Sequence, residues 1–232
     1  MPGPGFRALL VLVFVATLPA GAQAPSQGQR FEQKVLEYEA EDRAHPPPRG
    51  AILFAGDSQF YRWKTIHEDL AGYTLINRGI DSFQLENLVH YADRLVTVYQ
   101  PRLIVLHVGG NDVHNGKSPA RVLEDFRKFV DIVRARSQVP IIFSSLTPGP
   151  GRWDEKDQRM ETNRLVRDYI ATRPDLEFVD LWSAMLSADG QPREDLWVED
   201  RVHPNHAGYL IRVRLTLPLL GEPDRAMPTK AR

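Results

Sequence analysis

The stretch AILFAGDSQF, residues 51–60, decides how the rest of the sequence is interpreted. An apolar run of strand length ends in Gly56-Asp57, and Ser58 follows directly. A serine at a strand-to-helix turn either caps the helix or serves as a nucleophile, since negative charge is stabilised near a helix N-terminus. Taken alone, Ser58 is better interpreted as an N-cap, the commoner use of serine at this position.

Apolar runs like the first one recur along the chain and alternate with helical patterns. The runs lack polar alternation, which indicates strands that are buried on both faces. Strands that alternate with helices predict an α/β fold, a three-layer α/β/α sandwich around a parallel sheet. The expected strands are 51–55, 73–77, 102–108, 139–145 and 176–180, and the expected helices between and after them are 84–98, 118–136, 155–172 and 205–219.

The first 22 residues have the three parts of a secretory signal. Arg7 precedes an apolar run of 11 residues, 8–18, and the small residues 20–22 follow it. The run is far shorter than the roughly 20 residues that span a bilayer. We expect a signal peptide at 1–22, cleavage after Ala22 and a secreted or periplasmic protein without stable membrane insertion.

The remaining chain predicts one catalytic domain with short flanks. Residues 23–50 are predicted to form a linker and an amphipathic helix that stops at the prolines 46–48. The domain is expected over 51–221, followed by a C-terminal tail at 222–232.

Composition excludes several kinds of chemistry. The chain has no cysteine, which rules out thiol nucleophiles and thiolate metal sites. The formal net charge of -1 leaves no basic field for nucleic acid.

A serine nucleophile needs a base, and the best candidate lies in EDRVHPNHAGY near the C-terminus. Asp200 and His203 are three positions apart there. A carboxylate at that spacing can accept the Nδ1–H of the imidazole and leave Nε2 free to take a proton from serine. An isolated D-x-x-H is more often a surface loop that starts a helix. Asp180, at the end of the last run, is the competing carboxylate.

Two further strand ends carry groups that suit an oxyanion. Ligands of parallel sheets bind outside the carboxyl ends of the strands. Gly79 follows the second run and lets a backbone N–H approach a ligand, while Asn111 follows the third and offers a side-chain amide. Taken singly, both are ordinary loop residues.

The four strand-end motifs in chain order are more specific than any one of them. G-D-S, N-R-G, G-G-N-D and D-x-x-H-P-N follow one another, and with them the sequence resembles the SGNH hydrolase superfamily, the GDSL esterases and lipases. The four residues in that name correspond here to Ser58, Gly79, Asn111 and His203. The resemblance covers about residues 31–220.

The resemblance implies a flavodoxin-like, five-stranded parallel sheet and a serine hydrolase mechanism. Ser58 is then the nucleophile, His203 the base and Asp200 the carboxylate that orients it. The oxyanion hole is formed by the N–H of Ser58, the N–H of Gly79 and the side chain of Asn111. The family implies a small-molecule or carbohydrate ester as substrate, and no cofactor or metal.

The sequence determines the substrate less fully than it determines the mechanism. The sequence has no long apolar insertion that could form a lid, so we expect short-chain esters as substrates, with acetyl esters of carbohydrates as one class. The alternatives are a lipase, a thioesterase, a sugar O-acyltransferase and an inactive binding protein.

Gln59 stands where the motif usually has an apolar residue, and bears on the shape of the pocket. Trp153, Trp182 and Trp197 are candidates for lining the cleft, with core packing as the alternative. His206 invites a metal interpretation, which no partner motif supports.

Overall fold

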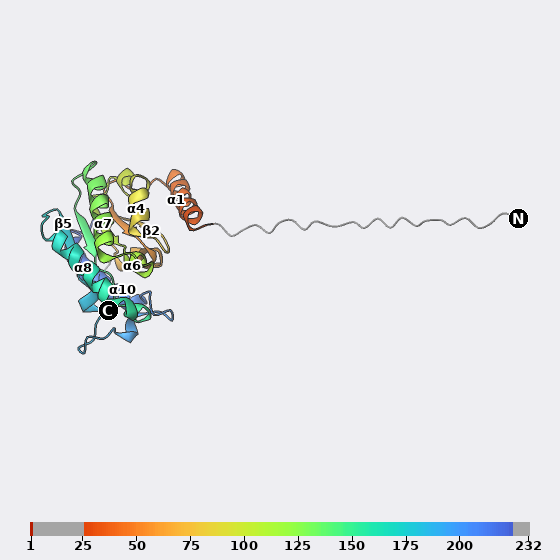
Figure 1. Cartoon of the computed structure of the whole chain (residues 1–232). Helices are drawn as coiled ribbons and strands as arrows, with labels where there is room; N and C mark the ends of the chain where they lie inside the picture. The colour runs from red at the N-terminus through yellow and green to blue at the C-terminus, as the bar shows by residue number, and fades with distance from the viewer. Residues whose placement is uncertain (2–25, 225–232) are drawn as a thin grey trace, which may run out of the picture.

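The five apolar runs form five parallel strands. A computed structural model describes Met1 and residues 26–224 (Figure 1). Its sheet has the order β2-β1-β3-β4-β5, and every neighbouring pair is parallel. The predicted α/β/α sandwich and its flavodoxin-like strand order are confirmed. The strands are β1 Ile52–Gly56, β2 Leu75–Gly79, β3 Leu103–His107, β4 Ile141–Ser144 and β5 Leu176–Val179.

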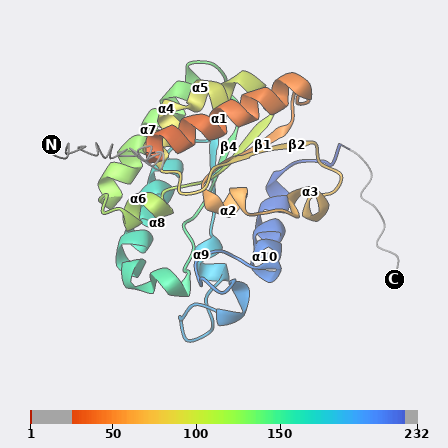
Figure 2. The same ribbon diagram turned by 90° about the vertical axis from the view of Figure 1, so that its right-hand side faces the viewer.

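Helices cover both faces of the sheet (Figure 2). The long ones are α1 Gln27–Ala44, α7 Pro119–Arg134, α8 Lys156–Ile170 and α10 His206–Thr216. The shorter ones are α2 Ser58–Tyr61, α3 Ile66–Asp69, α4 Leu85–His90, α5 Ala92–Leu95, α6 Gly110–His114 and α9 Leu181–Ala184, with 3₁₀ turns η1 Thr97–Tyr99, η2 Pro150–Glu155, η3 Glu194–Leu196 and η4 Leu217–Leu219.

Successive side chains of each strand enter different cores, because they point to opposite faces of the sheet. In β1, Leu53 packs with α1, α4, α7 and α8, whereas Phe54 packs with α2, α3, α9 and α10. Both side chains are fully buried. A strand with two apolar faces needs apolar residues at every position, which explains the uninterrupted runs in the sequence.

Helix α1 is anchored to the sheet near its edge. It begins with a capping box at Ser26, and Phe31 and Val35 are buried in the core. The Tyr38 hydroxyl donates a 2.6 Å hydrogen bond to the carbonyl of Gly79, the last residue of β2. The helix expected within 23–50 thus packs directly on the domain that follows it.

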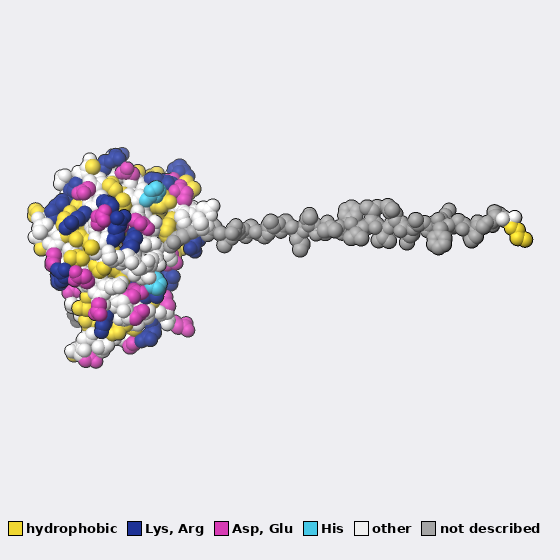
Figure 3. All heavy atoms as spheres, viewed as in Figure 1, with side chains coloured by type: hydrophobic (Ala, Val, Ile, Leu, Met, Phe, Trp, Pro, Cys, Tyr) yellow, Lys and Arg dark blue, Asp and Glu magenta, His cyan; other side chains and the backbone are white. Residues whose placement is uncertain are grey.

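The predicted signal peptide lies, apart from Met1, outside the described residues, as does most of the predicted tail. Within residues 26–224, no helix combines the length and apolarity needed to cross a bilayer. Acidic and basic side chains lie interspersed on the face of the molecule seen in Figure 3.

Candidate active site

Ser58 is the first residue of α2, directly beyond the carboxyl end of β1. Gly56 has φ +150°, and a Cβ there would lie 2.0 Å from the carbonyl oxygen of His107, so only glycine fits this turn. The N-cap of α2 is Asp57, whose Oδ1 accepts a 3.0 Å hydrogen bond from the Gln59 N–H. Interpreting Ser58 alone as an N-cap is therefore wrong, because the preceding carboxylate caps the helix.

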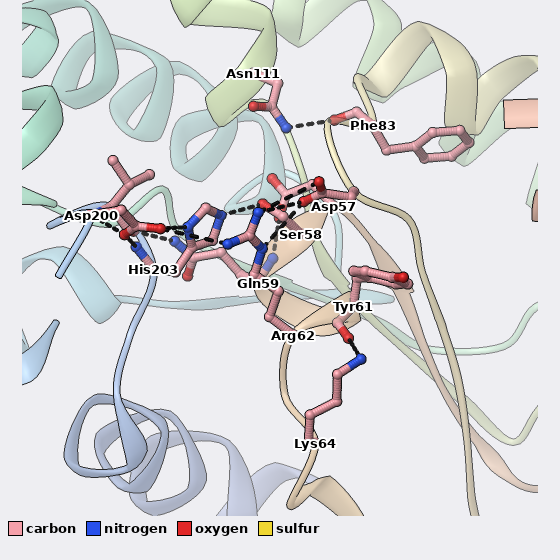
Figure 4. Close-up of polar contacts among 12 residues, drawn as sticks. Asp57, Ser58, Gln59, Tyr61, Arg62, Lys64, Phe83, Asn111, Asp200 and His203 are labelled. Atoms are coloured by element: carbon pink, nitrogen blue, oxygen red, sulfur yellow. Dashed lines mark hydrogen bonds and ion pairs between the residues drawn. The ribbon is translucent and has the colours of Figure 1, made fainter. Parts of the chain in front are cut away.

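Ser58, His203 and Asp200 form one chain of hydrogen bonds (Figure 4). Ser58 Oγ lies 2.8 Å from Nε2 of His203, and Nδ1 of His203 lies 2.7 Å from Oδ2 of Asp200. A carboxylate only accepts hydrogen bonds, so Nδ1 carries a proton, and in the neutral imidazole Nε2 then accepts from the serine hydroxyl. The sequence separates Ser58 from His203 by 145 positions.

The backbone around His203 holds Asp200 in its ionised form. Oδ1 of Asp200 accepts the N–H groups of Val202 and His203, both at 2.9 Å. Burial alone would raise the pKa of Asp200, but these two hydrogen bonds and the His203 ring outweigh burial and lower the pKa to about 2. The carboxylate is therefore available to orient the imidazole at any physiological pH.

The loop that carries His203 is packed against the segment after β4. The N–H of Gly151 donates to the carbonyl of Arg201 at 2.8 Å. A Cβ on Gly151 would lie 2.9 Å from the carbonyl oxygen of Asp200, so the absence of a side chain permits this approach. Asn205 is the N-cap of helix α10, and its Oδ1 accepts a hydrogen bond from the N–H of Gly208 at 3.1 Å.

The three predicted oxyanion donors lie at or beyond the carboxyl ends of neighbouring strands, but they differ in their hydrogen-bond partners. The Ser58 N–H makes no hydrogen bond within residues 26–224. The Gly79 N–H donates to Oδ1 of Asn77 at 2.9 Å, and Nδ2 of Asn111 donates to the carbonyl of Phe83 at 3.1 Å. One hydrogen of the Asn111 amide is left for another acceptor, since the amide carries two.

Packing requires a glycine at Gly79, the last residue of β2. A Cβ at this position would lie 2.3 Å from the backbone nitrogen of Tyr61 in α2. The Asn77 side chain spans the same contact, since its Nδ2 donates to the carbonyl of Phe60 at 2.8 Å. The nucleophile helix and the end of β2 are thus held together by a close backbone approach and by the Asn77 side chain.

The carboxylate and histidine competitors lie elsewhere. Asp180 caps α9, where its Oδ1 accepts the Ser183 N–H at 3.0 Å. His206 contacts Oδ1 of Asp69 at 2.8 Å with most of its side chain exposed. Across residues 26–224, no three His, Asp or Glu side chains come together in a way that could hold a metal ion.

The three candidate tryptophans divide between two places. Trp153 and Trp182 stack with ring centroids 5.9 Å apart, and Trp182 lines a cavity of about 380 Å³ together with Met160 and Phe178. Neither Ser58 nor His203 lines that cavity. Trp197 is buried and its Nε1–H donates to the carbonyl of Arg193 at 2.7 Å, as expected for core packing.

Sequence reasoning missed the polar groups that surround the nucleophile helix. Arg62 reaches Asp81 at 3.3 Å and Asp200 at 3.5 Å, and so connects the loops on two sides of Ser58. Arg212 lies fully buried beneath the helix, where burial lowers its pKa to about 10. The available signal was an arginine in the apolar stretch YLIRVRL of the last helix.

The comparisons with known proteins bear on this site as a whole. The model of the GDSL-like lipase/acylhydrolase family matches residues 50–211, which include Ser58, Gly79, Asn111, Asp200 and His203. The chain belongs to this family. As a GDSL-like acylhydrolase, it is a carboxylic ester hydrolase.

Solved structures share the fold of this GDSL-like acylhydrolase at low sequence identity. A candidate platelet activating factor from Streptococcus pneumonia superposes with a TM-score of 0.73 at 19% identity, over 82% of this chain and 92% of that one. A GDSL-like lipase from Bacteroides thetaiotaomicron gives 0.68 at 21% identity, over 80% and 96%.

A mutant of an acetyl-xylooligosaccharide esterase from Geobacillus Stearmophilus gives a TM-score of 0.61 at 19% identity, over 75% of this chain and 95% of that one. A sequence search of curated proteins found no significant match.

Proposed function

We propose that this acylhydrolase is an exported serine esterase that hydrolyses short-chain carboxylic esters with Ser58, His203 and Asp200 as its triad. The observation that carries the proposal is the continuous hydrogen-bond chain from Asp200 through His203 to Ser58, with steps of 2.7 and 2.8 Å. A nucleophile, a base and a group that orients the base at these distances meet the geometric requirement of acyl transfer.

The reaction follows from which atoms hold protons. Ser58 Oγ attacks the ester carbonyl while its proton moves to Nε2 of His203, and ionised Asp200 stabilises the imidazolium. His203 then gives this proton to the leaving alcohol, and an acyl group remains on Ser58. A water molecule, deprotonated by His203, attacks the acyl-enzyme, and the acid leaves as the serine regains its proton.

The negative charge that develops on the carbonyl oxygen is held by the N–H of Ser58, the N–H of Gly79 and the amide of Asn111. The support is that all three lie at or beyond the carboxyl ends of the adjacent strands β1, β2 and β3. Preorganised donors of this kind are usually the largest single contribution to such catalysis.

The substrate in this proposal is a short acyl ester of a polar alcohol, with acetylated carbohydrate as the favoured class. The charged side chains of Arg62, Asp81 and Asp200 flank the nucleophile helix, and such surroundings suit a polar alcohol better than a long alkyl chain. An esterase of acetyl-xylooligosaccharides has the same fold. Export rests on the N-terminal signal in the sequence, and N-terminal sequencing of secreted protein should find Gln23 first.

Two measurements test the proposal. The Ser58→Ala variant should lose at least about 10⁴-fold in kcat on p-nitrophenyl acetate, because no other hydroxyl occupies its place. Activity of the wild type should decline from the acetate to the laurate ester, and acetate should be released from acetylated xylan. Equal rates of wild type and Ser58→Ala would rule out the serine mechanism, while a maximum at laurate would indicate a lipase.

A further inference from the structure

Gln59, the residue after the proposed nucleophile, is buried and contacts three segments far away in the sequence. Its Nε2 donates to Oγ1 of Thr147 at 3.0 Å and to the carbonyl of Val202 at 3.3 Å. Its Oε1 accepts from Nη2 of Arg212 at 2.9 Å. The side chain, 6% exposed, therefore uses all its polar atoms in contacts with the protein itself.

Arg212 decides which way the Gln59 amide points. A guanidinium has donors only, so the oxygen of the amide must face it and the NH₂ group must face Thr147 and Val202. Within residues 26–224, Nε and Nη1 of Arg212 have no hydrogen-bond partner. The bond to Gln59 is thus the one hydrogen bond of this buried cation among the described residues.

The carbonyl that Gln59 binds belongs to the residue just before His203. The N–H of Val202 itself and the N–H of His203 both donate hydrogen bonds to Asp200. The backbone that carries the imidazole is therefore held from two directions, by the Asp200 carboxylate and by the amide of Gln59. Because Gln59 adjoins Ser58 in the chain, any shift of the base loop relative to the nucleophile would stretch the bond to Val202.

We infer that Gln59 is a positioning residue, whose amide holds Val202 and with it His203 at bonding distance from Ser58. This inference rests on the proposed serine mechanism. It assigns to Gln59 the orientation of the base and no contact with the substrate. The apolar residue usual at this position in the motif could fill the volume but could not donate to Val202.

Two substitutions separate positioning from stability. Gln59→Leu removes every polar contact of the side chain and leaves the Arg212 charge buried without an acceptor among the described residues, which destabilises the fold. Gln59→Glu keeps an acceptor for Arg212 and gives it a counter-charge, but turns its second oxygen towards the Val202 carbonyl. Both variants lose the hydrogen-bond donor to the Val202 carbonyl, but only Gln59→Leu also removes the acceptor of the Arg212 guanidinium.

The experiment compares these variants with the wild type in kcat and KM on p-nitrophenyl acetate, in thermal unfolding and in the rate at which a fluorophosphonate labels Ser58. In labelling, the serine oxygen displaces fluoride from phosphorus and His203 takes the proton, so the rate reports on the serine–histidine pair without an ester. We expect both variants to lose about 10- to 100-fold in kcat and in labelling rate with little change in KM, as for a misplaced catalytic group.

A double variant and a matched control complete the design. Gln59→Leu with Arg212→Met removes the buried charge together with its acceptor; it should unfold at a higher temperature than Gln59→Leu yet keep the low kcat. Arg134→Met removes a largely buried guanidinium that binds Asp175 and the carbonyl of Val139 just before β5 and β4, at the end of the sheet opposite to Ser58. It should lower the unfolding temperature and leave kcat unchanged.

The outcomes distinguish this inference from the mechanism on which it rests. Wild-type kcat in both Gln59 variants, with Ser58→Ala inactive, would overturn the role of Gln59 alone. So would recovery of kcat in the double variant, because the loss would then come from the isolated charge of Arg212. An active Ser58→Ala variant would instead remove the serine mechanism and the Gln59 inference together.

Discussion

The two halves of the site differ in how far they are assembled. Asp200, His203 and Ser58 are already connected, with hydrogen bonds of 2.7 and 2.8 Å. Two of the three expected oxyanion donors instead bind oxygens of the protein, Gly79 at Asn77 and Asn111 at Phe83. The proton-transfer half is thus connected without substrate, whereas in the charge-stabilising half the Gly79 N–H must share or exchange its partner when an oxyanion forms.

This difference has a physical origin. The triad joins a carboxylate, an imidazole and a hydroxyl that satisfy one another, so burial near the sheet does not leave polar atoms without partners. An oxyanion hole consists of donors alone, so its N–H groups have no acceptor from the substrate before the reaction. Nearby carbonyl or amide oxygens of the protein accept their hydrogen bonds instead. Hydrogen bonds of catalytic groups often align only in the complex with substrate.

The largest effect is expected from a substitution that breaks the triad of Ser58, His203 and Asp200. His203→Ala removes the base and should lower kcat at least about 10⁴-fold, as loss of a triad histidine does in other serine hydrolases. His206→Ala, three residues later and in contact with Asp69 at the surface, is the control and should keep wild-type kcat. Steady-state kinetics on p-nitrophenyl acetate measure both. A His203→Ala variant within tenfold of wild type would place the base elsewhere.

The second-largest effect tests the expected oxyanion donors, through Asn111, whose amide donates to the carbonyl of Phe83. Asn111→Ala should lower kcat by about 100- to 1000-fold, or roughly 3 to 4 kcal/mol of transition-state stabilisation, with a smaller change in KM. Asn115→Ala, at the exposed C-cap of the same short helix, should change neither constant. If Asn111→Ala retained most of its kcat, the bond to Phe83 would be the residue's whole role.

A smaller effect sharpens the question of Gly79. Asn77→Asp keeps an oxygen that accepts the Gly79 N–H but makes it an anion, and a charge-assisted bond holds the donor more tightly. The variant should lose about tenfold in kcat, since this carboxylate competes with the oxyanion for the same N–H and can no longer donate to the carbonyl of Phe60. Asn87→Asp makes the same exchange at the start of α4, where Oδ1 accepts the Gln84 N–H, and should be neutral. An unchanged kcat in Asn77→Asp would argue that Gly79 donates nothing to the oxyanion and that the bond from Asn77 to Phe60 does not position Ser58.

The smallest effect concerns Arg62, which connects the loops on two sides of Ser58. Arg62 pairs with Asp81 and Asp200, but all three side chains are substantially exposed to solvent. Exposed pairs contribute about 0–1 kcal/mol each, so Arg62→Ala should lower the free energy of unfolding by less than about 1 kcal/mol and change kcat by less than about threefold. Urea unfolding at low and high salt measures the first quantity. A loss of kcat comparable to that of Asn111→Ala would instead make Arg62 part of the substrate site.

Much of this architecture could be predicted from local sequence. The apolar runs located all five strands to within two residues at each end. A strand covered on both faces has to be apolar throughout, so its signal is continuous and difficult to miss. The order of the four motifs pointed to the residues that the structure brings together beyond these strands.

Other features depended on packing between remote segments. Asp57, not Ser58, caps α2, since the turn after Gly56 directs the carboxylate to the Gln59 N–H. Gln59 was expected to shape a pocket, yet it faces Val202, 143 positions away. His107 is buried in β3, where its Nδ1 has no hydrogen-bond partner within the described part of the chain and burial lowers its pKa.

The sequence by itself determined the parallel sandwich and the set of polar residues at its strand ends, because periodicity and motif order are properties of neighbouring residues. Only the tertiary structure decided which oxygens hold Gly79 and Asn111 at rest and how Gln59 and Arg212 brace the loop of His203. Those choices depend on distances between side chains that come together only when β1, β2, β3 and α10 are packed, and no local pattern encodes such distances.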